Sequence, residues 1–307
     1  IRPPPPTPTP ADCRRQRQMC IRESSQPMPT IKQILTEART TLTSPDARLE
    51  AELLLEAICA ISRSRQFSHP DEQLREDQFE QYKSALERRL SGEPLAHITG
   101  RRGFWDVDLR VTPDVLIPRS DTEILVEQAL QRIPYNARWQ IADLGTGSGA
   151  IAIVIARERP QCELTATDNS AAALAVAREN ATALGVNNIS FVAGSWGQPL
   201  KLRQFDVILS NPPYIRTDDP HMLRGDLPAE PIQALVSGSD GLDAIRRIIE
   251  DSATSLKPNG WLLLEHGYDQ AAEVSALLQH ADFNEIFTQK DYGGNSRVTG
   301  GRRQIEA

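Results

Sequence analysis

Apolar side chains recur at three- and four-residue spacing in the first third of the chain. Three such runs cover residues 31–38, 49–58 and 79–90, and charged residues lie between their apolar positions. This spacing gathers the apolar side chains on one face of a helix. The pattern therefore predicts a small helical-bundle domain over residues 29–91.

The apolar pattern changes from helical spacing to alternation after residue 91. Apolar and polar residues alternate over 104–111, and Gly100 and Gly103 flank a pair of arginines. Alternation is typical of strands, and glycine is typical of turns. We therefore expect residues 92–116 to form a linker that contains a short β-hairpin with its turn at residues 100–103.

Short apolar runs alternate with helical runs in the rest of the chain. The expected strands are 139–143, 163–168, 189–193, 205–210 and 261–265, and the expected helices are 151–159, 171–184 and 242–256. Strands separated by helices of this length form a parallel sheet with right-handed crossovers. The runs 285–290 and 297–302 flank two glycines and predict a terminal antiparallel hairpin. We therefore expect an α/β, Rossmann-like domain over residues 117–307.

Composition limits the classes of function. The 307 residues include 34 basic and 41 acidic side chains, which gives a formal charge of −7. Proteins that bind nucleic-acid phosphates usually carry a basic surplus, so we expect no direct nucleic-acid partner. The longest apolar run, 151–156, is far shorter than the ~18 residues that span a bilayer. The N-terminal segment lacks the apolar stretch that is typical of a secretory signal. We therefore expect a cytoplasmic monomer without membrane contact.

The N-terminal segment and the cysteines suggest no further site. Six of the first ten residues are proline, which predicts a disordered tail over residues 1–28. Metal-binding cysteines usually come in pairs two to four residues apart. No such pair exists among Cys13, Cys20, Cys59 and Cys162. We therefore expect reduced thiols and no metal.

A glycine-rich loop follows the first predicted strand of the sheet. Residues 141–150 read IADLGTGSGA, and a predicted helix begins directly after them. In doubly wound sheets such a loop lies at the carboxyl end of the first strand, where ligands bind. Gly145, Gly147 and Ala150 also fit the dinucleotide pattern G-x-G-x-x-G/A. The loop alone therefore leaves nicotinamide, flavin and S-adenosyl-L-methionine (adenosylmethionine) open, as well as a structural turn.

Two carboxylates next to this loop narrow the choice of ligand. Asp143 ends the first strand, where it would attract an ammonium group but repel a pyrophosphate, so it favours adenosylmethionine. Asp168 ends the second strand, 21 residues after Gly147. A carboxylate at that place can accept hydrogen bonds from both ribose hydroxyls of either cofactor. The alternative role of Asp168 is to cap the helix that follows it.

The tetrapeptide Asn-Pro-Pro-Tyr follows the fourth predicted strand. Asn211 offers a side-chain carbonyl oxygen, and Pro213 holds Pro212 extended, so that the Pro212 backbone oxygen points outward. A planar NH2 group can give one hydrogen to each oxygen, while Tyr214 packs against the planar substrate. This grip would aim an amide or exocyclic amine at a methyl donor. The alternative is a proline-rich turn with no such role.

With these motifs the chain resembles the HemK-type protein-(glutamine-N5) methyltransferases. The likeness rests on DLGTGSGA at 143–150, NPPY at 211–214, GEPLAHITG at 92–100, LIPRSDTE at 116–123, LLLEHG at 262–267 and DYGGNSRVTGGR at 291–302. It implies a class I methyltransferase domain after the helical bundle, with adenosylmethionine as co-substrate. It also implies that the substrate is the glutamine in the Gly-Gly-Gln motif of bacterial class I peptide chain release factors.

The resemblance also implies roles for individual residues. Asn211 would lie between cofactor and substrate and act in catalysis with Pro212 and Tyr214, and Asn211 to Tyr214, Pro213 included, would hold the glutamine amide. Asp168 would bind the ribose and Trp196 would pack near the adenine. The rest of the cofactor would be lined by Asp143, Leu144, Gly145, Thr146 and Gly147. Two positions depart from the family: Ser120 replaces a frequent proline, and Ser195 replaces a common acidic contact to the adenine amino group.

Three other functions are alternatives to this interpretation. An N6-adenine or N2-guanine nucleic-acid methyltransferase grips a flipped-out base with the same kind of loop, but the acidic balance and the helical N-terminal domain count against it. A nucleotide-binding regulator without methylation chemistry would tolerate the loss of Asn211. A nicotinamide oxidoreductase would need an acid for hydride transfer, and no residue obviously supplies one.

Overall fold

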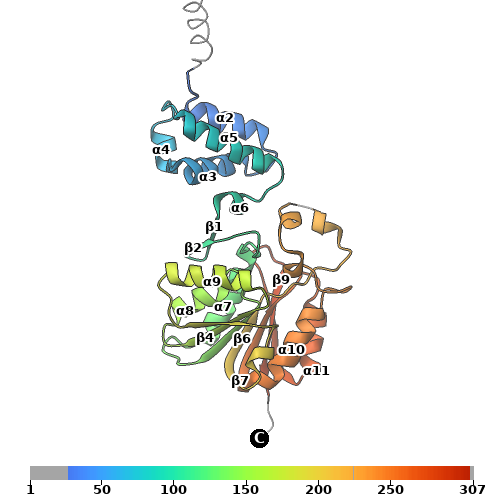
Figure 1. Ribbon diagram of the computed structural model, residues 1–307. Helices are drawn as coiled ribbons and strands as arrows, with labels where there is room; N and C mark the ends of the chain where they lie inside the picture. The colour runs from blue at the N-terminus through green and yellow to red at the C-terminus, as the bar shows by residue number, and fades with distance from the viewer. Residues whose placement is uncertain (1–26, 224, 305–307) are drawn as a thin grey trace, which may run out of the picture. The chain divides into compact units, whose positions relative to one another are not determined.

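The computed structural model describes residues 27–223 and 225–304 (Figure 1). All but the last two residues of the predicted tail, 1–28, lie outside the described residues. The chain forms two compact units that divide between Ser91 and Gly92. Each unit has its own buried apolar residues.

The first unit consists of short helices. They are α2 (Ile31–Thr41), α3 (Ala47–Cys59), α4 (Arg63–Ser68) and α5 (Glu76–Leu90). Helix α2 begins with a capping box, in which the Thr30 hydroxyl accepts a hydrogen bond from the Gln33 backbone and the Gln33 side chain accepts one from the Thr30 backbone. Leu54, Leu55 and Tyr82 are almost fully buried. The predicted helical region is therefore confirmed, with α4 as an unpredicted addition.

The second unit begins with a helix where the sequence predicted part of a hairpin. Residues Leu95–Thr99 form α6, which ends at Gly100 with a left-handed φ of 71°. The hairpin follows as β1 (Arg101–Phe104) and β2 (Val107–Arg110), and its turn contains Trp105. The predicted turn at residues 100–103 is therefore wrong. The left-handed glycine ends the helix instead of turning the hairpin.

A seven-stranded sheet forms the centre of the second unit. Its strands are β3 (Gln140–Leu144), β4 (Glu163–Asp168), β5 (Ile189–Ala193), β6 (Phe205–Ser210), β7 (Leu256–Glu265), β8 (Phe283–Lys290) and β9 (Ser296–Arg303), in the order β5-β4-β3-β6-β7-β9-β8. Strands β3 to β7 are parallel, and β9 is antiparallel to both of its neighbours. The mostly parallel sheet with a terminal antiparallel hairpin is as predicted.

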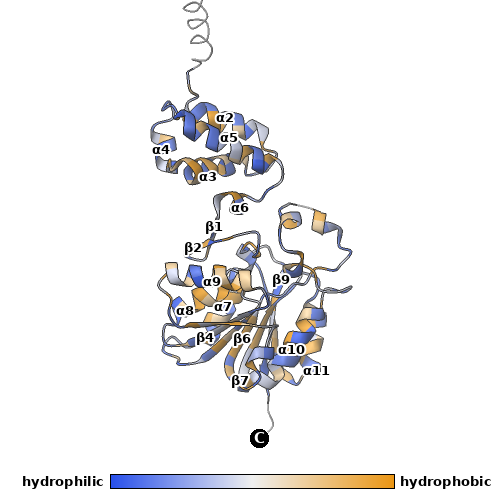
Figure 2. Cartoon of the chain, viewed as in Figure 1, coloured by the Kyte–Doolittle hydropathy of each residue, from blue (hydrophilic) through white to orange (hydrophobic). Residues whose placement is uncertain are grey.

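Helices cover both faces of this sheet. In Figure 1, α7 (Glu123–Arg132), α8 (Ala150–Glu158) and α9 (Ala171–Ala183) lie on one side, and α10 (Asp243–Ser255) and α11 (Ala271–His280) lie on the other. Successive residues of a strand point to opposite faces. Accordingly Ile141 packs into the first apolar layer and Ala142 into the second. Figure 2 shows hydrophobic and hydrophilic residues side by side along α10, as expected for a helix with one face on a sheet.

The parallel strands bring four chain segments to one edge of the sheet. Leu144, Asp168, Ser210 and Glu265 are the last residues of β3, β4, β6 and β7. Because these strands are parallel, their carboxyl ends meet at the same edge of the sheet. Strands β4 and β5 extend the sheet on one side of β3, and β6 and β7 extend it on the other, so β3 lies at the switch point of the strand order. Open α/β sheets bind their ligands at such a point.

Candidate active site

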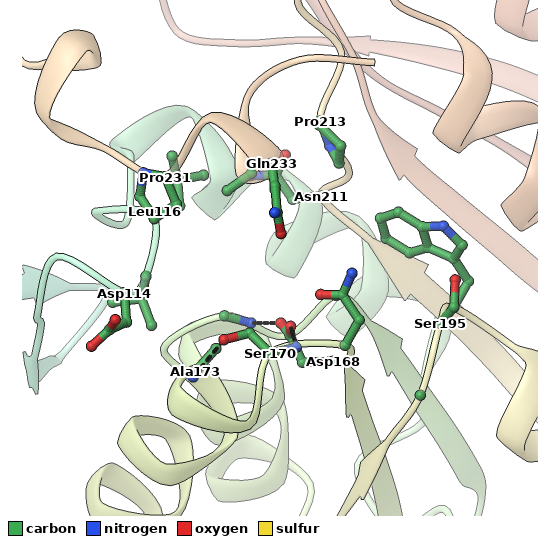
Figure 3. A pocket seen from close by; sticks show the side chains of 17 residues that line it. Asp114, Leu116, Asp168, Ser170, Ala173, Ser195, Asn211, Pro213, Pro231 and Gln233 are labelled. Atoms are coloured by element: carbon green, nitrogen blue, oxygen red, sulfur yellow. Dashed lines mark hydrogen bonds between the residues drawn. The ribbon is translucent and has the colours of Figure 1, made fainter. Parts of the chain in front are cut away.

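A pocket lies at this carboxyl edge of the sheet. It encloses about 800 Å³ between the surrounding atoms, counting the part open to solvent. Its wall combines the glycine loop, the ends of β4 and β6, and two segments from elsewhere in the chain (Figure 3). The lining residues that bear on the argument are Asp114, Leu116, Gly145, Gly147, Asp168, Ser170, Ser195, Trp196, Asn211, Pro213, Pro231 and Gln233.

The glycine loop approaches the pocket with exposed backbone. Gly145 and Gly147 have left-handed φ angles of 76° and 55°, which residues with a Cβ rarely adopt. A Cβ built on Gly145 would lie 2.8 Å from Cζ3 of Trp196. The indole therefore lies against the glycine, and the pair forms one wall of the pocket. The backbone of Trp196 is fixed by a hydrogen bond that its carbonyl oxygen accepts from the Thr167 hydroxyl.

A buried carboxylate lies beneath this loop. Asp143 is fully buried, and its Oδ2 accepts a hydrogen bond of 2.6 Å from the Thr146 hydroxyl. Its Oδ1 is also buried, but has no hydrogen-bond partner among the described residues. Burial raises the pKa of Asp143 to about 7, and the negative charge of Asp168 acts in the same direction. A buried acceptor without a partner is costly unless a ligand supplies a donor.

Asp168 accepts backbone hydrogen bonds from both the glycine loop and the turn before α9. Its Oδ2 accepts a hydrogen bond of 2.9 Å from the Gly147 backbone, and its Oδ1 accepts one of 2.9 Å from the Ser170 backbone. The carboxylate therefore fixes the glycine loop and the turn before α9. Each carboxylate oxygen has a second lone pair, and the side chain lines the pocket. Acceptor capacity for ligand hydroxyls is thus retained.

The residues of the tetrapeptide point in different directions. Asn211 and Pro213 line the pocket, and Asn211 Nδ2 donates to the Thr122 hydroxyl oxygen over 3.0 Å. Pro212 is buried. Tyr214 instead directs its hydroxyl toward Glu265 Oε1, 3.4 Å away. The structure therefore places the asparagine at the pocket and ties the tyrosine to the end of β7.

The predicted site residues divide into two groups. Those that line the pocket are Gly145, Gly147, Asp168, Trp196, Asn211 and Pro213, whereas Asp143, Leu144, Thr146, Pro212 and Tyr214 lie next to its wall without lining it. Leu144 is fully buried in the apolar layer below the loop. The cofactor and substrate roles of these residues stay predictions.

One wall of the pocket comes from a segment for which the sequence predicted no role. Figure 3 shows Gln233 projecting into the pocket from the short 3-10 helix Ile232–Ala234, above Asp168. Glu230 lies just before this 3-10 helix and anchors it. Its fully buried side chain accepts a 2.6 Å hydrogen bond from Arg119. Burial raises the pKa of Glu230 to about 7. A glutamine in a long loop carries no local pattern that could have indicated this position.

Metal-binding clusters and membrane-spanning helices are absent from the part of the chain that the structure describes. Within residues 27–223 and 225–304, no group of three or more histidine, cysteine or acidic side chains is arranged to hold a metal ion. The helices of this same part of the chain include none long and apolar enough to cross a membrane.

The residues around the pocket fit adenosylmethionine. The unpartnered Asp143 Oδ1 could accept from its ammonium group, and Asp168 could accept from its ribose hydroxyls. The Trp196 indole offers an apolar surface for a flat base. Ser195 also lines the pocket and places a hydroxyl there.

Adenosylmethionine affinity should depend on pH through Asp143. The ionised carboxylate attracts an ammonium group and the protonated acid does not, so affinity should fall as pH decreases through about 7, the pKa of Asp143. We expect the Kd to be about tenfold higher at pH 6 than at pH 8 by calorimetry. Asp143→Asn should bind weakly, with little change between these pH values. Equal wild-type Kd values at both pH values would contradict this role.

Comparison with known proteins identifies the family. A family model described as the PrmC N-terminal domain matches residues 33–100, and one described as the methyltransferase small domain matches residues 120–225. The chain is 49% identical over 255 residues to the release factor glutamine methyltransferase of Xylella fastidiosa (strain Temecula1), which covers 83% of this chain and 93% of that protein. It is 44% identical over 269 residues to the protein of the same name from Escherichia coli (strain K12), with 87% and 97% covered.

Solved structures agree on the fold. A methyltransferase from Pyrococcus furiosus aligns with a TM-score of 0.50 at 17% identity, over 73% of this chain and 100% of that one. The 16S rRNA N2 G1207 methyltransferase of Thermus thermophilus, solved with AdoMet and guanosine, aligns with a TM-score of 0.50 at 18% identity, over 66% of this chain and 50% of that one. The predicted class I methyltransferase fold is thereby confirmed. From its identity to the curated relatives, the chain belongs to the family of release factor glutamine methyltransferases.

Proposed function

We propose that this protein transfers the methyl group of adenosylmethionine to the side-chain amide nitrogen (N5) of the glutamine in the Gly-Gly-Gln motif of bacterial class I peptide chain release factors. The observation that carries the proposal is the position of Asn211, whose carboxamide lines the same pocket as the glycine loop. The names of the curated relatives support the same activity.

Positioning of the substrate amide is the main task of the site. An amide nitrogen is a weak nucleophile, because its lone pair is delocalised into the carbonyl. The Asn211 side-chain oxygen and the Pro212 backbone oxygen would each accept one hydrogen of the substrate NH2 group and hold its nitrogen about 3–3.5 Å from the methyl carbon. The same oxygens would stabilise the positive charge that develops on nitrogen.

The reaction needs no strong base before the methyl group moves. Bound adenosylmethionine supplies a methyl group on a positively charged sulfur: the S–CH3 bond breaks, the N–CH3 bond forms, and the sulfonium becomes a neutral thioether. The alkylated nitrogen is acidic and releases its proton to water. The chain therefore contributes orientation and hydrogen-bond acceptors.

We assign the cofactor to the wall that the glycine loop forms. Asp143 would hold the ammonium group through its unpartnered Oδ1, with the loop from Leu144 to Gly147 along the methionine and ribose. Asp168 would accept the ribose hydroxyls, and Trp196 would pack near the adenine. No metal takes part in this scheme.

The partner assignment is part of the same proposal. The formal charge of −7 favours a protein substrate over nucleic acid. We assign the helical unit before Gly92 to recognition of the body of that protein. The enzyme would act as a monomer in the cytoplasm, where release factors meet the ribosome.

Transfer of labelled methyl groups tests the function. The purified chain should transfer label from adenosylmethionine to a class I release factor, and mass spectrometry should locate one added methyl on the motif glutamine. A release factor with that glutamine replaced by alanine should stay unlabelled, as should duplex DNA and ribosomal RNA. Label on the alanine variant would refute the assigned substrate position, and label on nucleic acid alone would favour the alternative class.

A further inference from the structure

The orientation of one carboxamide decides whether the pocket can hold an amide substrate. Asn211 can present either its oxygen or its NH2 group, because the two flipped forms have nearly the same shape. An NH2 group facing the substrate NH2 would place donor against donor. The proposed function therefore requires that something fixes the oxygen of Asn211 toward the substrate.

The first contact that sets this orientation is with Thr122. This residue ends the 3-10 helix Ser120–Thr122 and is buried. Its hydroxyl oxygen lies 3.0 Å from Asn211 Nδ2. A hydroxyl can donate one hydrogen and can also accept. The contact alone is therefore compatible with both forms of the amide, and the direction depends on where the Thr122 hydrogen goes.

A buried carboxylate beside Thr122 can accept that hydrogen. Glu265, the last residue of β7, is 1% exposed, and its Oε2 has no hydrogen-bond partner among the described residues. The Thr122 hydroxyl acts on Glu265 as a hydrogen-bond donor and lowers the pKa of the carboxyl, against the larger effect of burial, which raises it to about 7. An ionised carboxylate can only accept. A Thr122 hydroxyl that gives its hydrogen to the ionised Glu265 can only accept from Asn211, in agreement with the 3.0 Å donation from Asn211 Nδ2 to the Thr122 oxygen.

The same carboxylate also contacts the second polar side chain of the tetrapeptide. The Tyr214 hydroxyl lies 3.4 Å from Glu265 Oε1. Arg297 and Asp121 are the other charged groups that act on Glu265, and Arg297 bridges Asp121 and Asp291 at 3.3 and 3.0 Å. Glu265 therefore contacts Tyr214 directly. Its influence on Asn211 passes through Thr122.

We propose that Thr122 and Glu265 are positioning residues that hold the Asn211 carboxamide with Nδ2 turned to Thr122 and its oxygen turned to the substrate amide. The expected effect of these residues on turnover rests on the proposed function. The orientation of the Asn211 amide does not. Neither residue touches the substrate in this scheme. Thr122 acts on Asn211 directly, and Glu265 acts through Thr122.

Paired substitutions at Thr122 test the role of the hydroxyl. Thr122→Val keeps the shape and removes the hydroxyl, so we expect kcat to fall about tenfold or more, with KM for the release factor and Kd for adenosylmethionine changed by less than about threefold. Thr122→Ser restores the hydroxyl and should recover kcat to within about threefold. Thr165→Val is the matched control, because the buried Thr165 hydroxyl has no partner to lose, and kcat should not change. A serine variant as slow as the valine variant would overturn the proposal.

A double-substitution cycle tests whether Glu265 acts through Thr122. Glu265→Leu should lower kcat, and combining it with Thr122→Val should give a loss close to the larger single loss. A loss equal to the product of the two single losses would show independent roles and overturn the proposed connection. Thermal unfolding at pH 8 should show folded variants, because replacing a buried carboxylate with an apolar side chain removes a desolvation cost.

An observation without turnover separates this inference from the proposed function. In protein labelled with 15N-asparagine, the side-chain signal that disappears in Asn211→Asp belongs to Asn211. Its Nδ2 protons should exchange with solvent about fivefold faster in Thr122→Val than in the wild type, and at the wild-type rate in Thr122→Ser. Equal exchange in all three proteins would refute the orientation, even in an enzyme that methylates glutamine. If the wild type methylates no glutamine but shows this exchange pattern, the proposed function fails and the orientation stands.

Discussion

Replacing Asn211 with alanine is expected to lower kcat for glutamine methylation by about 10³-fold, and to change Kd for adenosylmethionine by less than about threefold. The side-chain oxygen is one of two acceptors that would hold the substrate NH2 group, and alanine leaves only the Pro212 backbone oxygen. The amide would then sample many orientations, of which few allow in-line transfer. Single-turnover rates with bound cofactor measure the chemical step directly.

A surface asparagine provides the control for this substitution. Asn187 is exposed in the loop after α9, so Asn187→Ala should keep wild-type kcat and Kd. If Asn211→Ala retained more than about a tenth of wild-type kcat, the carboxamide would not be one of the acceptors that position the substrate NH2 group. A regulator without methylation chemistry predicts that Asn211→Ala leaves function intact.

Replacing Gly145 with alanine is expected to raise Kd for adenosylmethionine about 100-fold. The added Cβ would lie 2.8 Å from Cζ3 of Trp196, so the indole has to leave its place along the pocket wall. The φ angle of 76° also adds backbone strain of about 1–2 kcal/mol. Calorimetric titration with adenosylmethionine measures the affinity.

A second glycine separates the displacement of Trp196 from the backbone strain. Gly185 has a similar φ of 68°, but a Cβ built on it meets no atom within 4 Å. Gly185→Ala should therefore lower the melting temperature through backbone strain alone, without changing Kd. Equal Kd values for the wild type and Gly145→Ala would show that the indole does not form a wall of the cofactor site.

The sheet could be predicted closely from the sequence because its strands are short and apolar. The bounds of β4, β5 and β6 agree with the predicted runs. Both faces of the sheet are covered, so these strands are buried on two sides and give clear apolar runs between polar loops. Parallel order then brought Asp143, Asp168 and Asn211 to the same edge, which is why spacing along the chain was enough to predict a shared site.

Elements without a clean local pattern could not be predicted. Helix α7 contains the continuous apolar run Ile124-Leu125-Val126 in its first turn, which hides the helical period although all three side chains are buried. The five-residue α6 is too short to show a period, and the hairpin turn was therefore placed too early. Helix α4, with six residues, is equally short.

Contacts over long sequence separations explain the rest of what the sequence did not show. Gln233 reaches the pocket because Glu230 is paired with Arg119, more than a hundred positions away. Glu265 contacts the Tyr214 hydroxyl although the two residues lie far apart in the sequence. The tyrosine was predicted to pack on the substrate, but the structure directs its hydroxyl to this buried carboxylate, so its part in holding the amide stays a prediction.

A crystal structure of the chain with S-adenosylhomocysteine and a peptide containing Gly-Gly-Gln would test the central claim most directly. The account predicts that the glutamine side-chain nitrogen lies within about 2.7–3.2 Å of both the Asn211 side-chain oxygen and the Pro212 backbone oxygen, and faces the sulfur of the bound thioether. A glutamine bound elsewhere, or an Asn211 oxygen turned toward Thr122 in that complex, would contradict it.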